Sequence, residues 1–189
     1  TDEKGFISII TTDIRIKVPT IGFAQSASKM SIENFALIAN DSLINDNNAN
    51  VTSPVAGVTA NGGDVRISGN VFGGYDGVKV ANQKRIRFVT NAADASAGTT
   101  VKYQLIADSL NVDNAREASA GLFVADTYET YVDSINLQTA RIGLDGVMYV
   151  GNDLDIGGKR SIVKLGGKYY GYGNINGDSD KSSSILING

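Results

Sequence analysis

The chain has 189 residues, with 17 Lys and Arg against 20 Asp and Glu, a formal net charge of −3, and no His, Cys or Trp. This length suits one domain, residues 1–189. The missing residue types exclude a Ser-His-Asp relay, a thiolate nucleophile and a zinc site built on imidazole or thiolate, and the acidic balance argues against nucleic acid as a partner.

Short runs of alternating apolar residues predict β-strands along the chain. In chain order, these runs are 14–18, 65–71, 78–80, 86–88, 142–144, 147–150, 154–156, 162–165 and 185–187. Asn-Gly, Asp-Gly and Gly-Gly pairs between the runs predict tight turns. Two further stretches, 28–40 and 114–131, show some helical spacing, but we predict strand and loop for both.

Three segments of the chain resemble one another. The segment at Ile38 (Ile-Ala-Asn-Asp-Ser-Leu-Ile) resembles those at Ile106 (Ile-Ala-Asp-Ser-Leu) and Val150 (Val-Gly-Asn-Asp-Leu-Asp-Ile). The starts are 68 and 44 residues apart, close to three and two steps of about 22 residues, which is a solenoid period. Such a coil holds three short strands, and stacked coils pair these strands in parallel.

Composition agrees with the stacked coils. Of the 20 acidic residues, 16 are Asp, and there are 22 Gly, both suited to corners. We therefore predict an all-β, single-stranded parallel β-helix with coils of about 22 residues; the alternative is an antiparallel β-sandwich. One spacing does not fit, because the similar segments at Phe72 and Tyr169 lie 97 residues apart.

Tyrosines set among glycines form the first candidate contact site. Tyr169, Tyr170 and Tyr172 could make a flat aromatic platform for a sugar ring or a partner protein, and Tyr75 beside Phe72 could make a smaller one. Strand alternation places Tyr170 and Tyr172 on one face and Tyr169 on the other, so at least one of the three should pack.

An oxygen-rich loop is the one candidate metal site. Its ligands would be Asn174, Asn176, Asp178 and Asp180, which alternate as in a calcium loop but lack the EF-hand glycine and terminal Glu. We favour an exposed turn here and predict no cofactor, with calcium as the alternative.

Two charged groups are candidates for other chemistry. Asp153 and Asp155 share a strand face and could act as paired carboxylates, although solvated residues are the preferred interpretation. The basic run at residues 84–87 places Arg85 and Arg87 on one face, where an anion or an acidic polysaccharide could bind. We predict no catalytic residues.

Residues 145–189, and less closely 60–90, resemble a recurrent block in large surface proteins of Gram-positive anaerobes. The residues that carry this likeness are 151–165, 167–173 and 182–189, together with 67–80. The family consists of pilus-assembly proteins with a PilX-like N-terminus and a β-helical ectodomain. The resemblance implies a scaffold exported to the cell surface. The family's apolar anchor is missing here, so we expect an excised part of a longer protein, attached to a membrane only through a segment not in this chain.

Together, these observations predict a non-enzymatic, extracellular structural or adhesive module of a bacterial surface or pilus-associated protein. Its expected partners are a host glycan, a matrix protein or pilus subunits. Two alternatives remain: a polysaccharide-acting β-helix enzyme (lyase or glycosidase) and a self-assembling filament subunit whose open coil ends stack.

Overall fold

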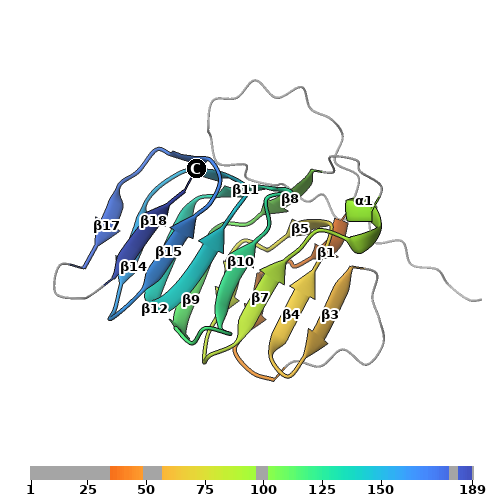
Figure 1. The fold of residues 1–189 in the computed structure, drawn as a ribbon, viewed down its shortest axis with the longest axis horizontal. Helices are drawn as coiled ribbons and strands as arrows, with labels where there is room; N and C mark the ends of the chain where they lie inside the picture. The colour runs from red at the N-terminus through yellow and green to blue at the C-terminus, as the bar shows by residue number, and fades with distance from the viewer. Residues whose placement is uncertain (1–34, 49–56, 97–101, 179–182, 189) are drawn as a thin grey trace, which may run out of the picture.

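The computed structural model describes residues 35–48, 57–96, 102–178 and 183–188. They form a parallel β-solenoid whose strands stack in three sheets that surround one apolar core (Figure 1). This confirms the predicted β-helix over the β-sandwich. No helix in these ranges is long and apolar enough to cross a membrane.

Sheet A contributes the first strand of each coil. In spatial order its strands are β1 (Phe35–Ile38), β5 (Asn70–Phe72), β8 (Tyr103–Ile106), β11 (Tyr128–Val132), β13 (Val147–Val150) and β16 (Tyr169–Gly171), all parallel.

Sheet B contributes the second strand. Its strands are β2 (Ser42–Asn45), β6 (Gly77–Val80), β9 (Ser109–Ala115), the first half of β12 (Ser134–Leu144), β14 (Leu154–Gly157) and β17 (Ile175–Gly177).

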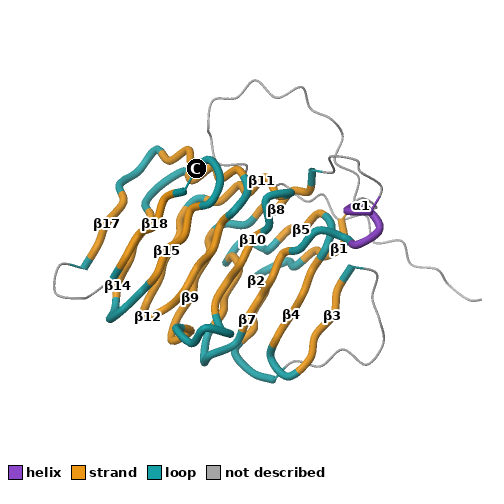
Figure 2. Tube along the Cα trace, viewed as in Figure 1, coloured by secondary structure: helices purple, strands orange, loops and turns teal. Residues whose placement is uncertain are grey.

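Sheet C contributes the third strand. Its parallel strands are β4 (Asp64–Ile67), β7 (Arg85–Phe88), β10 (Gly121–Val124), the second half of β12, β15 (Ile162–Leu165) and β18 (Ser184–Ile187). At one edge, β3 (Val58–Asn61) pairs with β4 in the opposite direction. The short helix α1 (Ala92–Ser96) lies between β7 and β8 in the chain, outside the sheets (Figure 2).

Coil length varies along the solenoid. In sheet C, Leu122, Ile142, Val163 and Ile185 stack in register. Their steps along the chain are close to the predicted period, which is confirmed for this part of the solenoid. Earlier in the chain, Ile38, Phe72 and Ile106 also stack in register. Each of these two steps is about one and a half times the predicted period of about 22 residues. The interval from Ile38 to Ile106 therefore holds two lengthened coils and not the three that the sequence predicted.

The core is a set of aliphatic columns. Because parallel strands are in register and side chains alternate between faces, each inward position lies directly above the equivalent position of the next coil. In sheet B, for example, Val78, Leu110, Ile135 and Leu154 stack with no exposed surface.

One aromatic side chain ties distant coils together inside this core. Tyr128 is fully buried against the rings of Phe88 and Tyr103, and its hydroxyl donates to the carbonyl oxygen of Gly69 at 2.9 Å. The hydroxyl thereby satisfies its donor inside the core.

Most predicted strands within the described residues are confirmed. In the 28–40 stretch, β1 is a strand, and in the 114–131 stretch β9, β10 and β11 are strands joined by loops. The predicted strand at 14–18 lies outside the described residues, as does residue 180 of the calcium loop. The sequence did not predict α1 or the antiparallel β3.

Candidate functional site: an aromatic column on the outer face of sheet A

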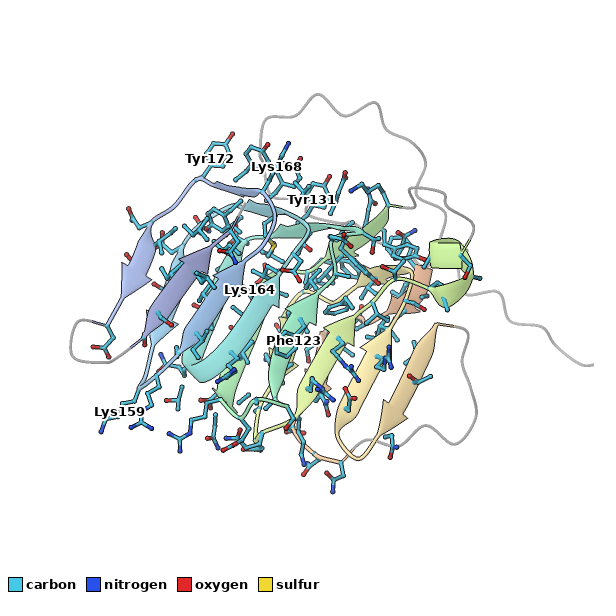
Figure 3. The ribbon with its side chains drawn as sticks, in the orientation of Figure 1. Phe123, Tyr131, Lys159, Lys164, Lys168 and Tyr172 are labelled. Atoms are coloured by element: carbon cyan, nitrogen blue, oxygen red, sulfur yellow. The ribbon has the colours of Figure 1, made fainter. Side chains whose placement is uncertain are left out.

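An apolar column runs along the outer face of sheet A, with one side chain from each coil. We call it the outer aromatic column; its members are Ile38, Phe72, Ile106, Tyr131, Tyr149 and Tyr170, which are mutual register partners. The adjacent strand positions, such as Leu105 and Met148, are buried in the core, so strand alternation directs the column outward. Two of its members, Phe72 and Ile106, are nevertheless only 6% and 7% exposed, so the accessible part of the column consists of Ile38 and the three tyrosines. Figure 3 shows Tyr131 at this upper face.

Three tyrosines of the column stack on one another. The ring centroids of Tyr131 and Tyr149 are 4.9 Å apart with planes 9° from parallel, and those of Tyr149 and Tyr170 are 5.2 Å apart at 13°. These distances are close to the spacing of neighbouring strands, about 4.8 Å, so the stack is a direct result of the register. Each stacked pair contributes about 0.5–1.5 kcal/mol.

The stacking decides which part of each ring faces outward. Tyr149 has one ring face against Tyr131 and the other against Tyr170. The column therefore presents ring edges and hydroxyl groups at intervals of about one strand spacing. Tyr149 therefore has no open ring face.

Burial and a neighbouring acid raise the pKa of two hydroxyls in this column, those of Tyr131 and Tyr149. The Tyr131 hydroxyl donates to Glu129 Oε2 at 3.1 Å. Burial raises the pKa of Tyr131 and of Tyr149, and the negative charge of Glu129 raises the pKa of both further. Both groups thus keep their hydrogen-bond proton at neutral and mildly alkaline pH.

The four tyrosines predicted from the sequence take different positions. Tyr169 faces inward and packs against the core, as strand alternation predicted for one of the group. Burial raises its pKa, and its hydroxyl is buried without a hydrogen-bond partner among the described residues. Tyr170 and Tyr172 are 48% and 72% exposed. Tyr75 lies at the far end of the solenoid, with its ring edge-on to Phe72 at 5.5 Å.

The sequence reasoning missed Tyr131 and Tyr149, which complete the stack. The signal was present as spacing, since Tyr131, Tyr149 and Tyr170 each follow the one before after a single coil. This signal could be recognised only by dividing the sequence into coils of unequal length.

Among the candidate calcium residues that the structure describes, Asn176 lies on β17, and Asn174 and Asp178 flank this strand. Asn176 donates through Nδ2 to Asp155 Oδ1 at 2.7 Å and to Asp153 Oδ2 at 3.2 Å, and the Asn174 backbone donates to Asp153 Oδ1 at 2.7 Å. Within the described ranges, no three or more acidic side chains gather closely enough to hold a metal ion.

These contacts also bear on the paired carboxylates. Asp153 and Asp155 both accept hydrogen bonds from Asn176, on sheet B. Arg85 and Arg87 lie on sheet C instead, where both contact Asp64. The structure therefore does not bring this carboxylate pair beside these arginines.

Comparisons with known proteins gave no relative. No protein-family model matches the chain, and no match was found among curated proteins or among solved structures.

Proposed function

We propose that this chain is a non-enzymatic structural and adhesive module of a bacterial surface protein, and that the outer aromatic column is its contact face. The observation that carries the proposal is the stack of Tyr131, Tyr149 and Tyr170 on the outside of sheet A. Tyrosine is enriched in protein interfaces, where its ring and its hydroxyl both contribute. The solenoid holds these side chains in a fixed row on rigid strands.

A protein is the partner class that this face favours. Tyr131 and Tyr149 offer ring edges and hydroxyl donors, which suit hydrogen bonds and packing against another polypeptide. A matrix protein or a pilus subunit would meet this requirement. The extracellular location is part of the proposal and is supported by the resemblance of residues 145–189 to surface-protein ectodomains.

The test is a binding screen of the protein against panels of matrix proteins, pilus subunits and glycans. Replacing both exposed tyrosines, Tyr170→Ala with Tyr172→Ala, should weaken a protein ligand by about tenfold or more, the loss expected for interface hot spots. The matched control is Ile44→Ala, because Ile44 is 53% exposed on the outer face of sheet B. Affinity by biolayer interferometry and folding by circular dichroism are measured for each variant.

Equal binding by the wild type and the double tyrosine variant would contradict the assignment of the contact face. If the wild-type protein binds no member of any panel, the adhesive part of the proposal is contradicted and only the structural role remains.

A self-assembling filament subunit is a second candidate, favoured by the last described coil. Its core positions Ile175, Ile185 and Ile187 are 45%, 41% and 63% exposed, whereas Leu154, Val163 and Leu165, their partners one coil earlier, are at most 2% exposed. Apolar edge strands of this kind can pair with a strand from another chain. A second copy of the solenoid, stacked end to end, would bury these side chains, as would a further coil of a longer chain.

Sedimentation at rising concentration checks this candidate. We expect open-ended growth for the wild type, and no growth for Ile187→Lys, because a lysine on an edge strand opposes edge pairing. Asp113→Lys, on the outer face of the interior strand β9, should assemble like the wild type. A strictly monomeric wild type would exclude the filament.

A further inference from the structure

The outer face of sheet C carries a concentration of positive charge that the chain as a whole does not have. Its outward positions supply five cations and are flanked by two acids, Asp64 and Asp145, on a chain of net charge −3; the cations are Arg66, Arg85, Arg87, Arg141 and Lys164. We call this surface the cationic face. Figure 3 shows Lys164 and Phe123 on the sheet nearest the viewer.

One carboxylate holds two of the arginines. Asp64 accepts from Arg85 at 3.0 Å (Nε) and 2.8 Å (Nη2), and Arg87 bonds the same carboxylate through its Nε and Nη2. Burial tends to raise the pKa of Asp64, but the hydrogen bonds and charges of the two guanidinium groups together hold this pKa below its usual value. Asp64 therefore stays ionised and cancels one of the two charges.

Arg66 is the register partner of Arg87 on the neighbouring strand. It forms no ion pair with any residue that the structure describes. The cluster of Arg66, Arg85, Arg87 and Asp64 thus has two net positive charges. Beside Arg66 is a hollow of about 260 Å³, whose lining combines polar residues (Thr59, Ser68, Thr90 and Asn91) with apolar ones (Val58, Val89 and Ala92). The guanidinium group of Arg66 is the charged donor that could receive an anionic group there.

Phe123 lies in the middle of this face. In register order, the outward column is Arg66, Arg87, Phe123, Gly143 and Lys164. The ring of Phe123 leans over Gly143, since a Cβ on that glycine would be 2.9 Å from the phenyl Cδ1. Gly143 therefore leaves the space that lets an aromatic ring lie along the sheet between the cationic ends.

At the other end of this column the charge is only weakly compensated. Lys164 Nζ is 3.5 Å from Asp145 Oδ1, and both side chains are about half exposed, at 50% and 46%. An exposed ion pair of this kind contributes little to stability. An anionic ligand can therefore replace Asp145 as the partner of Lys164. Arg66 and Lys164 are four strands apart in register, so with a strand spacing of about 4.8 Å they lie about 19 Å apart along the solenoid.

We propose that the cationic face binds a linear acidic polysaccharide, laid along the solenoid axis. Its anionic groups pair with Arg66 and Lys164, and a sugar ring between them packs on Phe123. This site is separate from the outer aromatic column and does not depend on it. Charge complementarity favours a sparsely charged polymer over duplex DNA, which carries one charge per about 1.7 Å of its axis and would be repelled by the acidic remainder of the chain.

The test uses immobilised polygalacturonate and chondroitin sulfate as carboxylated and sulfated probes, with neutral dextran and a duplex DNA as controls. Binding to at least one acidic polysaccharide should weaken with rising salt, because it depends on ion pairs. Arg66→Gln and Lys164→Gln should each weaken it by about tenfold, since a charged partner is lost. The matched control Lys79→Gln removes one cation from the outer face of sheet B and should change affinity by about twofold or less.

Two further variants test the proposal if Arg66→Gln or Lys164→Gln fails to fold. Phe123→Leu retains the charge of the face but removes the aromatic ring, and should weaken polysaccharide binding without changing its salt dependence. Asp64→Asn removes the competing carboxylate and should strengthen binding. The proposal is overturned if neither polysaccharide binds at low salt, if Lys79→Gln costs as much as Arg66→Gln, or if DNA binds more tightly than both polysaccharides.

Discussion

Replacing Ile142 with alanine is expected to destabilise the solenoid by about 2–5 kcal/mol, the cost of an aliphatic truncation at a buried position. Ile142 is 1% exposed and stacks between Leu122 and Val163 in the middle of sheet C. Neighbouring coils on both sides are held in register, so they cannot collapse into the space without disturbing their own columns. Chemical denaturation followed by circular dichroism measures the loss.

The same column supplies a matched control. Ile185 occupies the equivalent position in the last described coil and is 41% exposed. Ile185→Ala should cost about 1 kcal/mol or less, because less apolar surface leaves the core. Both variants are measured at a concentration at which the protein is monomeric. Similar losses for the two isoleucines would contradict the view that stability resides in the enclosed columns.

The last three coils could be predicted from the sequence because no insertion interrupts them. Between Leu122 and Ile185 the core residues of sheet C recur at nearly equal steps, and from Val147 onward each coil repeats three short strands separated by turns. Apolar alternation and Gly pairs are then sufficient local signals.

The earlier coils could not be divided correctly from the sequence. Phe72 and Ile106 are register partners one coil apart, and this coil is lengthened by a segment that includes α1. A fixed period therefore divides this interval incorrectly. Variable coil length also explains the one spacing that did not fit, since the outer aromatic column joins Phe72 to Tyr170 through coils of unequal length.

The sequence marked some of the corner residues of the coils, but not all of them. The bias toward Asp, Asn and Gly does mark turns, and Asn82 and Asn114 adopt the left-handed conformation, with φ of 54° and 45°. Thr139 and Arg160 also adopt this conformation, with φ of 53° and 62°. Neither residue favours it by itself, so the stacked coils impose the bend and local preference could not have revealed it.

The two proposed binding faces could not be predicted from the sequence, for the same reason. Tyr131 and Tyr170, like Arg66 and Lys164, are distant in the sequence and share a face only because coils stack in register. The sequence indicates which residue types are present, but the register decides which of them share a face. Clusters that are local in the chain, such as Tyr169, Tyr170 and Tyr172, divide between the core and the surface.

Gly77→Ala is expected to be about as damaging as the Ile142 truncation, for a backbone reason. Gly77 begins β6 with φ +83°, a conformation that costs a residue with a Cβ about 1–2 kcal/mol. An added Cβ would also collide with the backbone of Ser109 on the neighbouring strand β9. Relieving such a collision in a packed site costs roughly a further 1–3 kcal/mol.

Gly62 separates these two effects. It also has a positive φ, +58°, but a Cβ there would meet no atom within 4 Å. Gly62→Ala should therefore show only the conformational cost of about 1–2 kcal/mol, and the difference between the two variants measures how tightly β6 and β9 approach. Equal losses of stability for the two variants would contradict this close approach, because they would mean that β6 and β9 separate locally to make room for the added Cβ. A larger loss for Gly77→Ala means that the stack itself, and not the turn alone, requires glycine at this corner.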